Sequence, residues 1–434
     1  MKSLGLAMVG ALMATAALPQ SLSLEPAKFP ELDMREVEVG RFLFYDPILS
    51  GNKTVSCSTC HHTKLGTSDG LPLGIGDGGN GLGTERVVDP NNMPEQRVPR
   101  NSPALFNLGA AQFVSLFHDG RLEADLNRPS GIRSPLEDEM VVGFDSVLSA
   151  QAMFPVLSGD EMAGHYSENE ISKAVRLGML TGEGGAWDLI AKRVVAIEEY
   201  QTLFAPILPE GEQIKFTDIS NAIAAFITFE WRADESPFDH YLNDGKPLPA
   251  NAQAGLELFY GKADCASCHT GIFQTDHSFH AIAMPQIGPG KGARFETHAK
   301  DVGRMHTTGD DADAYKFRTP SLRNIELTAP YGHAGAHATL EETLRHHADP
   351  VASLMAYTLS VDLPELEGAT DLRIMDDPSE VDAIAKANEL HPQELSDQEI
   401  NQLVAFLKSL TDPISKQGRL GVPDRVPSGL KFDQ

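Results

Sequence analysis

All four cysteines of the chain lie in two copies of one short motif. The copies read Cys57-Ser-Thr-Cys60-His61 and Cys265-Ala-Ser-Cys268-His269. Two cysteines separated by two residues and followed by histidine favour covalent haem, because the thiols form thioethers with the haem vinyl groups and the histidine binds iron. A zinc or redox Cys-x-x-Cys motif would not need a histidine directly after it in both copies. The sequence therefore predicts two c-type haems.

Length and composition predict two globular domains with one haem in each. The chain has 434 residues, of which 41% are hydrophobic, enough for two packed cores. Ser-Pro, glycine and further prolines break the pattern near 233–250. We therefore expect an N-terminal haem domain over 24–240 and a C-terminal haem domain over 241–434. The formal charge of −26 excludes nucleic acid and anionic membrane surfaces as partners, and it favours a basic redox protein.

The first 23 residues have the pattern of a secretory signal peptide. Met1-Lys2 is followed by an alanine-rich apolar run from Leu4 to Leu18 and then by polar Gln20-Ser21. This run is shorter than the ~20 residues that a membrane span requires. No later segment is long and apolar enough to span a bilayer. The mature protein is therefore expected to be exported, without a membrane span, to the periplasm.

Apolar periodicity and capping patterns predict a largely helical chain. Periodic helices are expected at 33–45, 187–204, 217–231 and 251–260, and capping boxes predict helix starts at 167–170, 339–342 and 396–399. The glycine-rich stretch 65–83 and the polar stretch 270–313 are expected to be loops. Histidines 277, 280, 298 and 306 in the second loop lack the regular spacing of a metal cluster. The predicted fold class is all-α, with two cytochrome c-like haem domains and long loops.

Five motifs, in order along the chain, carry a resemblance to a known family. They are SGNKTVSCSTCH at 50–61, RNSPALFN at 100–107, FHDGR at 117–121, SPFDHYL at 236–242 and RTPSLRNIELTAPYGHAG at 318–335. With them the chain resembles the bacterial di-haem cytochrome c peroxidases and their relative MauG. The resemblance implies a peroxidatic N-terminal haem, an electron-transfer C-terminal haem and hydrogen peroxide as substrate.

The resemblance also implies two residues on the open side of the N-terminal haem. After FHDGR the chain departs from the compact peroxidase pattern by an inserted loop at 122–150, which we expect to be polar and irregular. The pattern resumes at Gln151 and Glu161, which keep the family's spacing and the proline between them. A carboxylate can move a proton between the oxygens of bound peroxide, and an amide can orient it. The alternative is that both residues are ordinary polar residues near a turn.

Two departures from the family pattern concern access and electron transfer at this haem. Typical members carry a histidine in the glycine-rich loop that blocks the iron, but no histidine occurs from Thr63 to Phe117. We therefore expect an iron open to peroxide without reductive activation, unless a residue such as Met93 binds it. His118 replaces the family's tryptophan between the haems, so the usual relay is in doubt. His118 is then a spacer, a hydrogen-bond donor or an ordinary structural histidine.

Further family ligands carry over to the region between the domains and to the C-terminal half. An asparagine and two backbone carbonyls bind structural calcium in the relatives; they correspond to Asn101, Thr328 and Pro330, and the alternative is that these only shape a turn. The distal ligand of the C-terminal haem corresponds to His347, which takes the place of a methionine or tyrosine. Because adjacent helix residues point about 100° apart, His346 and His347 cannot both face the iron. We favour His347; the alternatives are that His346 is the ligand or that His347 is an ordinary histidine near the end of a helix.

Three functions remain open on the sequence. The first is a periplasmic peroxidase that takes electrons from a small cytochrome c or copper protein. The second resembles MauG and the di-haem enzymes of methanobactin gene clusters, which use high-valent iron to oxidise a tryptophan of a partner protein; here the partner would be a secreted substrate protein. The third is a non-catalytic electron carrier in which both irons are blocked.

Overall fold

The computed structural model describes residues 24–292 and 299–434. The predicted signal peptide, residues 1–23, and His298 lie outside the described residues. Helices account for 38% of the structure and strands for 5%. The fold is therefore mostly helical, as expected, with short strands that the sequence did not predict. Within the described ranges, no helix has both the length and the apolar character needed to cross a membrane.

Two crossing helices form the framework of the N-terminal half. α1 (Met34–Tyr45), capped by Asp33, packs along α7 (Phe216–Glu230). A Cβ atom on Gly40 would lie 1.8 Å from the carbonyl oxygen of Ala222, so the close approach requires glycine. The other helices of this half are α2 (Cys57–Cys60), α3 (Val147–Ala152), α4 (Glu170–Arg176), α5 (Ala186–Val195) and α6 (Glu198–Phe204).

The C-terminal half repeats this arrangement. α9 (Ala250–Phe259) packs along α14 (Asp397–Lys408), and a Cβ atom on Gly255 would lie 1.9 Å from the carbonyl oxygen of Gln402. The remaining helices are α8 (Pro237–Asp244), α10 (Met305–Thr308), α11 (Leu340–Ala348), α12 (Pro350–Met355) and α13 (Pro378–Ala387). Each Cys-x-x-Cys-His motif thus follows a glycine-bearing helix that packs on a later helix. This repetition suits one haem per half, which stays a prediction.

Short antiparallel strands connect the loops. β1 (Gly79–Asn80) pairs with β2 (Val87–Val88), and β6 (Phe279–His280) pairs with β7 (Phe317–Arg318). β3 (Ser115–Leu116), β4 (Leu122–Ala124) and β5 (Ile132–Arg133) form a three-stranded sheet. The inserted segment 122–150 therefore begins as a small hairpin and not as an irregular loop.

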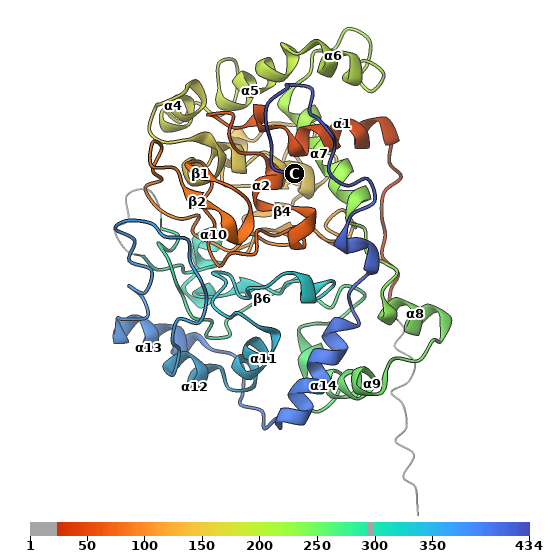
Figure 1. The fold of residues 1–434 in the computed structure, drawn as a ribbon, viewed down its shortest axis with the longest axis vertical. Coiled ribbons are helices and arrows are strands. Elements are labelled where there is room, and N and C mark those ends of the chain that lie inside the picture. Colours follow the sequence, from red (N-terminus) through yellow and green to blue (C-terminus); the bar gives the residue numbers. More distant parts are fainter. Residues whose placement is uncertain (1–23, 293–298) are drawn as a thin grey trace, which may run out of the picture.

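The end of the chain returns to the N-terminal half (Figure 1). Val426 is buried in the core of that half, and the ring of Phe432 lies 6.1 Å from that of Tyr45. The hydroxyl of Thr59, inside the first haem motif, donates to the carboxylate of Asp433 at 3.1 Å. The last residues therefore fasten the C-terminal half of the sequence to the first haem motif.

Most predicted helices have nearly the expected boundaries, with two differences. The helix predicted over 187–204 is divided into α5 and α6. Asn169, rather than Ser167, caps α4, because its side chain accepts hydrogen bonds from two main-chain amides of the first turn. The predicted caps Thr339 and Ser396 stand directly before α11 and α14.

Candidate active site

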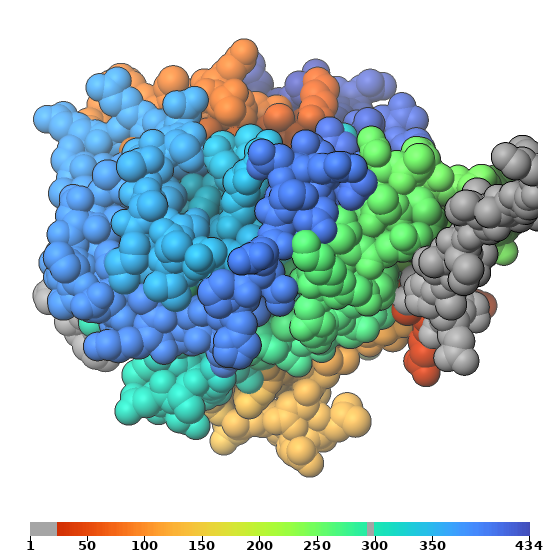
Figure 2. All heavy atoms as spheres, turned by 90° about the horizontal axis from the view of Figure 1, so that it is seen from below, coloured from red at the N-terminus to blue at the C-terminus, as the bar shows by residue number. Residues whose placement is uncertain are grey.

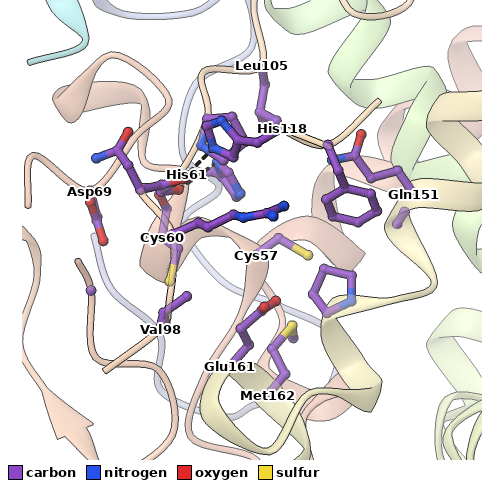
Figure 3. A pocket seen from close by; sticks show the side chains of 18 of the residues that line it. Cys57, Cys60, His61, Asp69, Val98, Leu105, His118, Gln151, Glu161 and Met162 are labelled. Carbon is purple, nitrogen blue, oxygen red and sulfur yellow. Dashed lines mark hydrogen bonds between the residues drawn. The ribbon is translucent and has the colours of Figure 1, made fainter. Parts of the chain in front are cut away.

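A cavity in the N-terminal half is lined by the whole first motif, Cys57, Cys60 and His61 (Figure 3). Its volume is about 140 Å³, and its walls are mostly apolar. The combination of two thiols, an imidazole and an apolar space suits a covalently attached haem.

The imidazole of His61 is oriented for metal binding. Its Nδ1 donates to the carbonyl oxygen of Thr67 at 2.9 Å, and the hydroxyl of Ser102 lies 3.2 Å from the same nitrogen. Burial lowers the pKa of His61, which keeps the ring neutral. With the proton on Nδ1, the lone pair of Nε2 is free to bind iron.

Gln151 and Glu161 line the same cavity on segments that adjoin each other. Gln151 lies on α3, and its side-chain oxygen is buried without a hydrogen-bond partner among the described residues. Glu161 lies on a single π-helical turn, Gly159–Ala163, an irregularity that is frequent at functional sites. Figure 3 shows the Glu161 side chain near Cys57 and the Gln151 side chain farther away, on the right of the view. The structure therefore brings together the two predicted distal residues.

The electrostatics of Glu161 combine burial with two nearby cations. Burial raises the pKa of its carboxyl group, whereas Lys291 and Arg121 lower it. Its exposed surface is only partial and lies against the cavity. A carboxyl group in this environment can both accept and return a proton at a reacting ligand.

His118 also lines the cavity, and its hydrogen bond and its pKa restrict its role. Its Nε2 donates to the carbonyl oxygen of Asn101 at 3.0 Å. Burial, and after it the charge of Arg100, lowers the pKa of His118 to about 3. His118 is therefore a neutral hydrogen-bond donor at physiological pH. Its main-chain oxygen accepts from Arg318 on β7, so it joins the cavity to the C-terminal half.

Two methionines are candidate ligands that could block the iron on the side opposite His61. Met93 is 47% exposed and is not part of the cavity lining, which argues against it as a ligand. Met162 does line the cavity but is 4% exposed and packs in the hydrophobic core. Met162 is thus the thioether that an experiment must test.

A second histidine, His347, lies near the histidine of the C-terminal motif. Nδ1 of His269 donates to the carbonyl oxygen of Gln274 at 3.0 Å, and Nδ1 of His347 donates to that of Thr343 at 2.8 Å. Burial lowers the pKa of His269 to about 4, and His347 is the next contributor to that shift. Both rings thus leave Nε2 free, and they lie close enough to influence each other.

The neighbouring His346 is excluded by its hydrogen bonds. Its side chain is fully buried, with Nδ1 3.1 Å from the hydroxyl of Ser353 and Nε2 2.8 Å from the carbonyl oxygen of Ile282. Neither nitrogen is available to a metal. The choice of His347 over His346 therefore has direct geometric support.

Comparison with known proteins agrees with this geometry. A family model for di-haem cytochrome c peroxidases matches residues 34–246. The cytochrome c551 peroxidase of Pseudomonas aeruginosa is 30% identical over 302 residues, which cover 69% of this chain and 67% of that protein. The chain belongs to the di-haem cytochrome c peroxidase family. It is accordingly a haem-dependent oxidoreductase of a family whose cofactors are c-type haems.

Two other relatives cover nearly the whole chain. Methylamine utilization protein MauG of Methylorubrum extorquens is 29% identical over 416 residues, covering 92% of this chain and 88% of that protein. A solved structure of a MauG-like protein associated with microbial copper homeostasis is 27% identical, with a TM-score of 0.59, and covers 92% of this chain and 96% of its own. The family therefore contains both peroxidases and MauG-like proteins among the relatives of this chain.

Four charged residues of the cavity were missed by sequence reasoning. They are Asp69, Arg100, Arg121 and Lys291. Burial raises the pKa of Asp69 to about 7. Arg100 and Arg121 belong to motifs already quoted, so they could have been found there. Lys291 belongs to no motif and comes from the other half of the sequence.

Asn101, Thr328 and Pro330 are the residues expected to bind calcium. The amide nitrogen of Asn101 donates to the carbonyl oxygens of Leu71 and Pro72, which leaves its Oδ1 without a hydrogen bond among the described residues. The peptide bond between Ala329 and Pro330, directly after Thr328, is cis. Within the described residues no side-chain hydrogen bond joins Asn101 to Thr328 or Pro330, so calcium stays a prediction.

Among the described residues, the polar loop 270–313 contributes to one cluster of potential ligand atoms. Those of Cys268, Asp276 and His280 lie within 4.8 Å of one another. Nε2 of His280 is 2.8 Å from Asp276, and Cys268 belongs to the haem motif. The cluster is therefore explained by an ion pair next to a haem-attachment cysteine.

Proposed function

We propose that the protein reduces hydrogen peroxide to water in the N-terminal cavity and receives electrons through a haem in the C-terminal half. Cys57, Cys60 and His61 would hold the N-terminal haem. Cys265 and Cys268 would hold the second, with His269 and His347 on the two sides of its iron. The N-terminal group, when bound, supplies an iron at which peroxide can bind and be reduced.

The side chains of the cavity have separate tasks in this reaction. Glu161 accepts the proton of the near peroxide oxygen and returns it to the far oxygen, which leaves as water. The Gln151 amide orients the ligand by hydrogen bonding. The apolar walls limit water, which strengthens each of these interactions.

The difference between the two iron sites carries the proposal. In the N-terminal cavity, the residues that accompany His61 are a carboxyl group with partial exposure toward the cavity and an amide oxygen without a partner. At the C-terminal site, His269 is accompanied by a second histidine with a free Nε2. An open site with an acid–base group suits peroxide chemistry, whereas an iron bound by two histidines suits electron transfer.

The proposed electron donor is a small cytochrome c or copper protein. The formal charge of −26 would attract a donor with a basic contact surface. The proposed location is the periplasm, in line with the predicted signal peptide at 1–23.

Resting-state electron paramagnetic resonance tests the proposal at the metal. One high-spin ferric signal, lost on adding cyanide, and one low-spin signal are expected. Two low-spin signals would instead support the non-catalytic carrier. A Met162→Leu variant identifies the source of any second low-spin centre. Steady-state peroxide reduction with reduced cytochrome c completes the test, and a negligible rate would refute the peroxidase.

A second function is favoured by the MauG-like relatives and by the missing loop histidine. In this alternative, the oxidising equivalents from peroxide are used on a tryptophan of a secreted partner protein. The test is the peroxide-dependent change in mass of a candidate partner incubated with the enzyme. Modification of the partner together with negligible cytochrome turnover would favour this function over the first.

We further propose a structural calcium between the halves, bound by Asn101 Oδ1 and the carbonyl oxygens of Thr328 and Pro330. Oxygen ligands suit this hard cation. Elemental analysis of the purified holoenzyme would detect it.

A further inference from the structure

A loop of the C-terminal half brings Lys291 into the N-terminal cavity. The main-chain amide of Gly288 donates to the carbonyl oxygen of Asp371 at 2.8 Å, and the carboxylate of Asp371 binds Arg97 of the N-terminal half at 2.9 Å. A Cβ atom on Gly288 would lie 2.1 Å from the side chain of Leu73. The loop is therefore fixed against the glycine-rich loop that covers the first haem site.

The charges around Lys291 differ in whether they are paired. Arg100 binds Asp301 at 2.6 Å and Asp119 at 2.7 Å, and Arg121 lies 3.1 Å from Asp119. Neither Lys291 nor Glu161 forms an ion pair with any described residue, although Ser158 hydrogen-bonds the Glu161 side chain. Buried charges without a charged partner are costly, and they are typical of functional sites.

Glu161 and Lys291 influence each other across the cavity. Among its charged neighbours, Lys291 lowers the pKa of Glu161 most and Arg121 follows, while Asp160 raises it. Burial and then Arg121 lower the pKa of Lys291, whereas Glu161 and Asp119 raise it. Both residues line the same cavity.

We propose that Lys291 is a positioning residue that keeps Glu161 in its carboxylate form, ready to accept a proton. Burial alone favours the protonated acid, which cannot take a proton from peroxide. An opposite charge in the same cavity offsets this, and the effect reaches about one to three pH units where the two groups are close together. The acid–base group and the cation that prepares it thus come from different halves of the chain. The inference rests on the proposed function for the identity of the oxidant only.

The test uses the full-length holoenzyme and three variants. Lys291→Gln removes the charge, Lys291→Arg restores it, and Lys300→Gln is the control, because Lys300 lies on the same segment but pairs with Glu380 at 2.8 Å. Stopped-flow absorbance gives the rate constant for reaction with peroxide as a function of pH. We expect the acid limb of this profile to move up by about one to two pH units in Lys291→Gln. In Lys291→Arg the acid limb should return to its wild-type position, and in Lys300→Gln it should not move from that position.

Infrared difference spectroscopy during pH titration provides a readout that needs no peroxide. The carbonyl band of protonated Glu161, identified by its loss in Glu161→Gln, should appear at higher pH in Lys291→Gln than in the wild type. An unchanged titration would overturn the inference. A shifted titration in a protein that does not react with peroxide would leave the inference standing and refute the proposed function.

Two other results would overturn the inference by giving Lys291 a different partner. If Lys291→Gln converts a low-spin ferric signal into a high-spin one, then Lys291 binds the iron. If the variant changes the haem reduction potential but not the titration of Glu161, then Lys291 pairs with a haem propionate.

Discussion

Replacing Glu161 by glutamine tests the proposed acid–base chemistry most directly. Glutamine keeps the size and hydrogen-bonding capacity of the side chain but cannot exchange a proton with peroxide. Gln151 and the apolar cavity remain, so binding should be little affected. General acid–base catalysis contributes roughly 10²–10⁴-fold, which corresponds to about 3–5 kcal/mol of transition-state stabilisation. Because only the proton transfer is removed, we expect the lower part of this range, about 10²–10³-fold.

The assay is the rate of the Soret absorbance change on mixing the oxidised holoenzyme with hydrogen peroxide. Asp160→Asn is the matched control, because Asp160 lies on the same turn but its carboxylate accepts from Gln96 at 2.8 Å and does not line the cavity. The control should stay within about threefold of the wild type, since it removes no group of the reaction. A Glu161→Gln rate within the same limits would refute the assignment of Glu161 as the acid–base residue.

Four further predictions follow from the structure. Replacing His347 by leucine should abolish the low-spin ferric signal, whereas His346→Gln should keep it, as measured by electron paramagnetic resonance. Since burial raises the pKa of Glu161 above the ordinary value of 4.5, the peroxide rate should increase with pH through a midpoint above that value in a stopped-flow pH series. Chelation of calcium should lower the melting temperature of the wild type, and Asn101→Ala should remove this sensitivity. Val426→Ala should destabilise the protein by about 1–3 kcal/mol in denaturant unfolding, because this side chain is 1% exposed in the core of the N-terminal half.

Local sequence patterns were sufficient to predict much of the helical structure. The caps at Thr339 and Ser396 involve residues three positions apart, so their interactions do not depend on the rest of the fold. At Ser167 the same pattern was misleading, because Asn169 two residues later offers a better-placed acceptor. The strands of the inserted segment are too short to leave a period in the sequence.

The sequence predicted those residues of the candidate site that belong to recognisable motifs. His61 was found from the Cys-x-x-Cys-His motif, and Gln151 and Glu161 were implied by the family resemblance; all three line the cavity. The preference for His347 over His346 came from the family resemblance, because helix geometry shows only that both cannot face one iron, and their hydrogen bonds agree with it. Lys291 could not be found in this way, because its place in the cavity depends on contacts between segments far apart in the sequence.

The cavity proposed for peroxide chemistry is a joint product of both halves of the chain. Arg100 on its wall is paired with Asp301, and both side chains are buried. Removing one member of such a pair costs about 3–5 kcal/mol, because the other charge is left buried alone. Arg304 binds Glu123 at the base of the inserted hairpin at 2.6 Å, and Lys291 enters the cavity itself. The C-terminal half therefore does more than hold an electron-transfer site, since it also supplies charges that shape the site where peroxide would react.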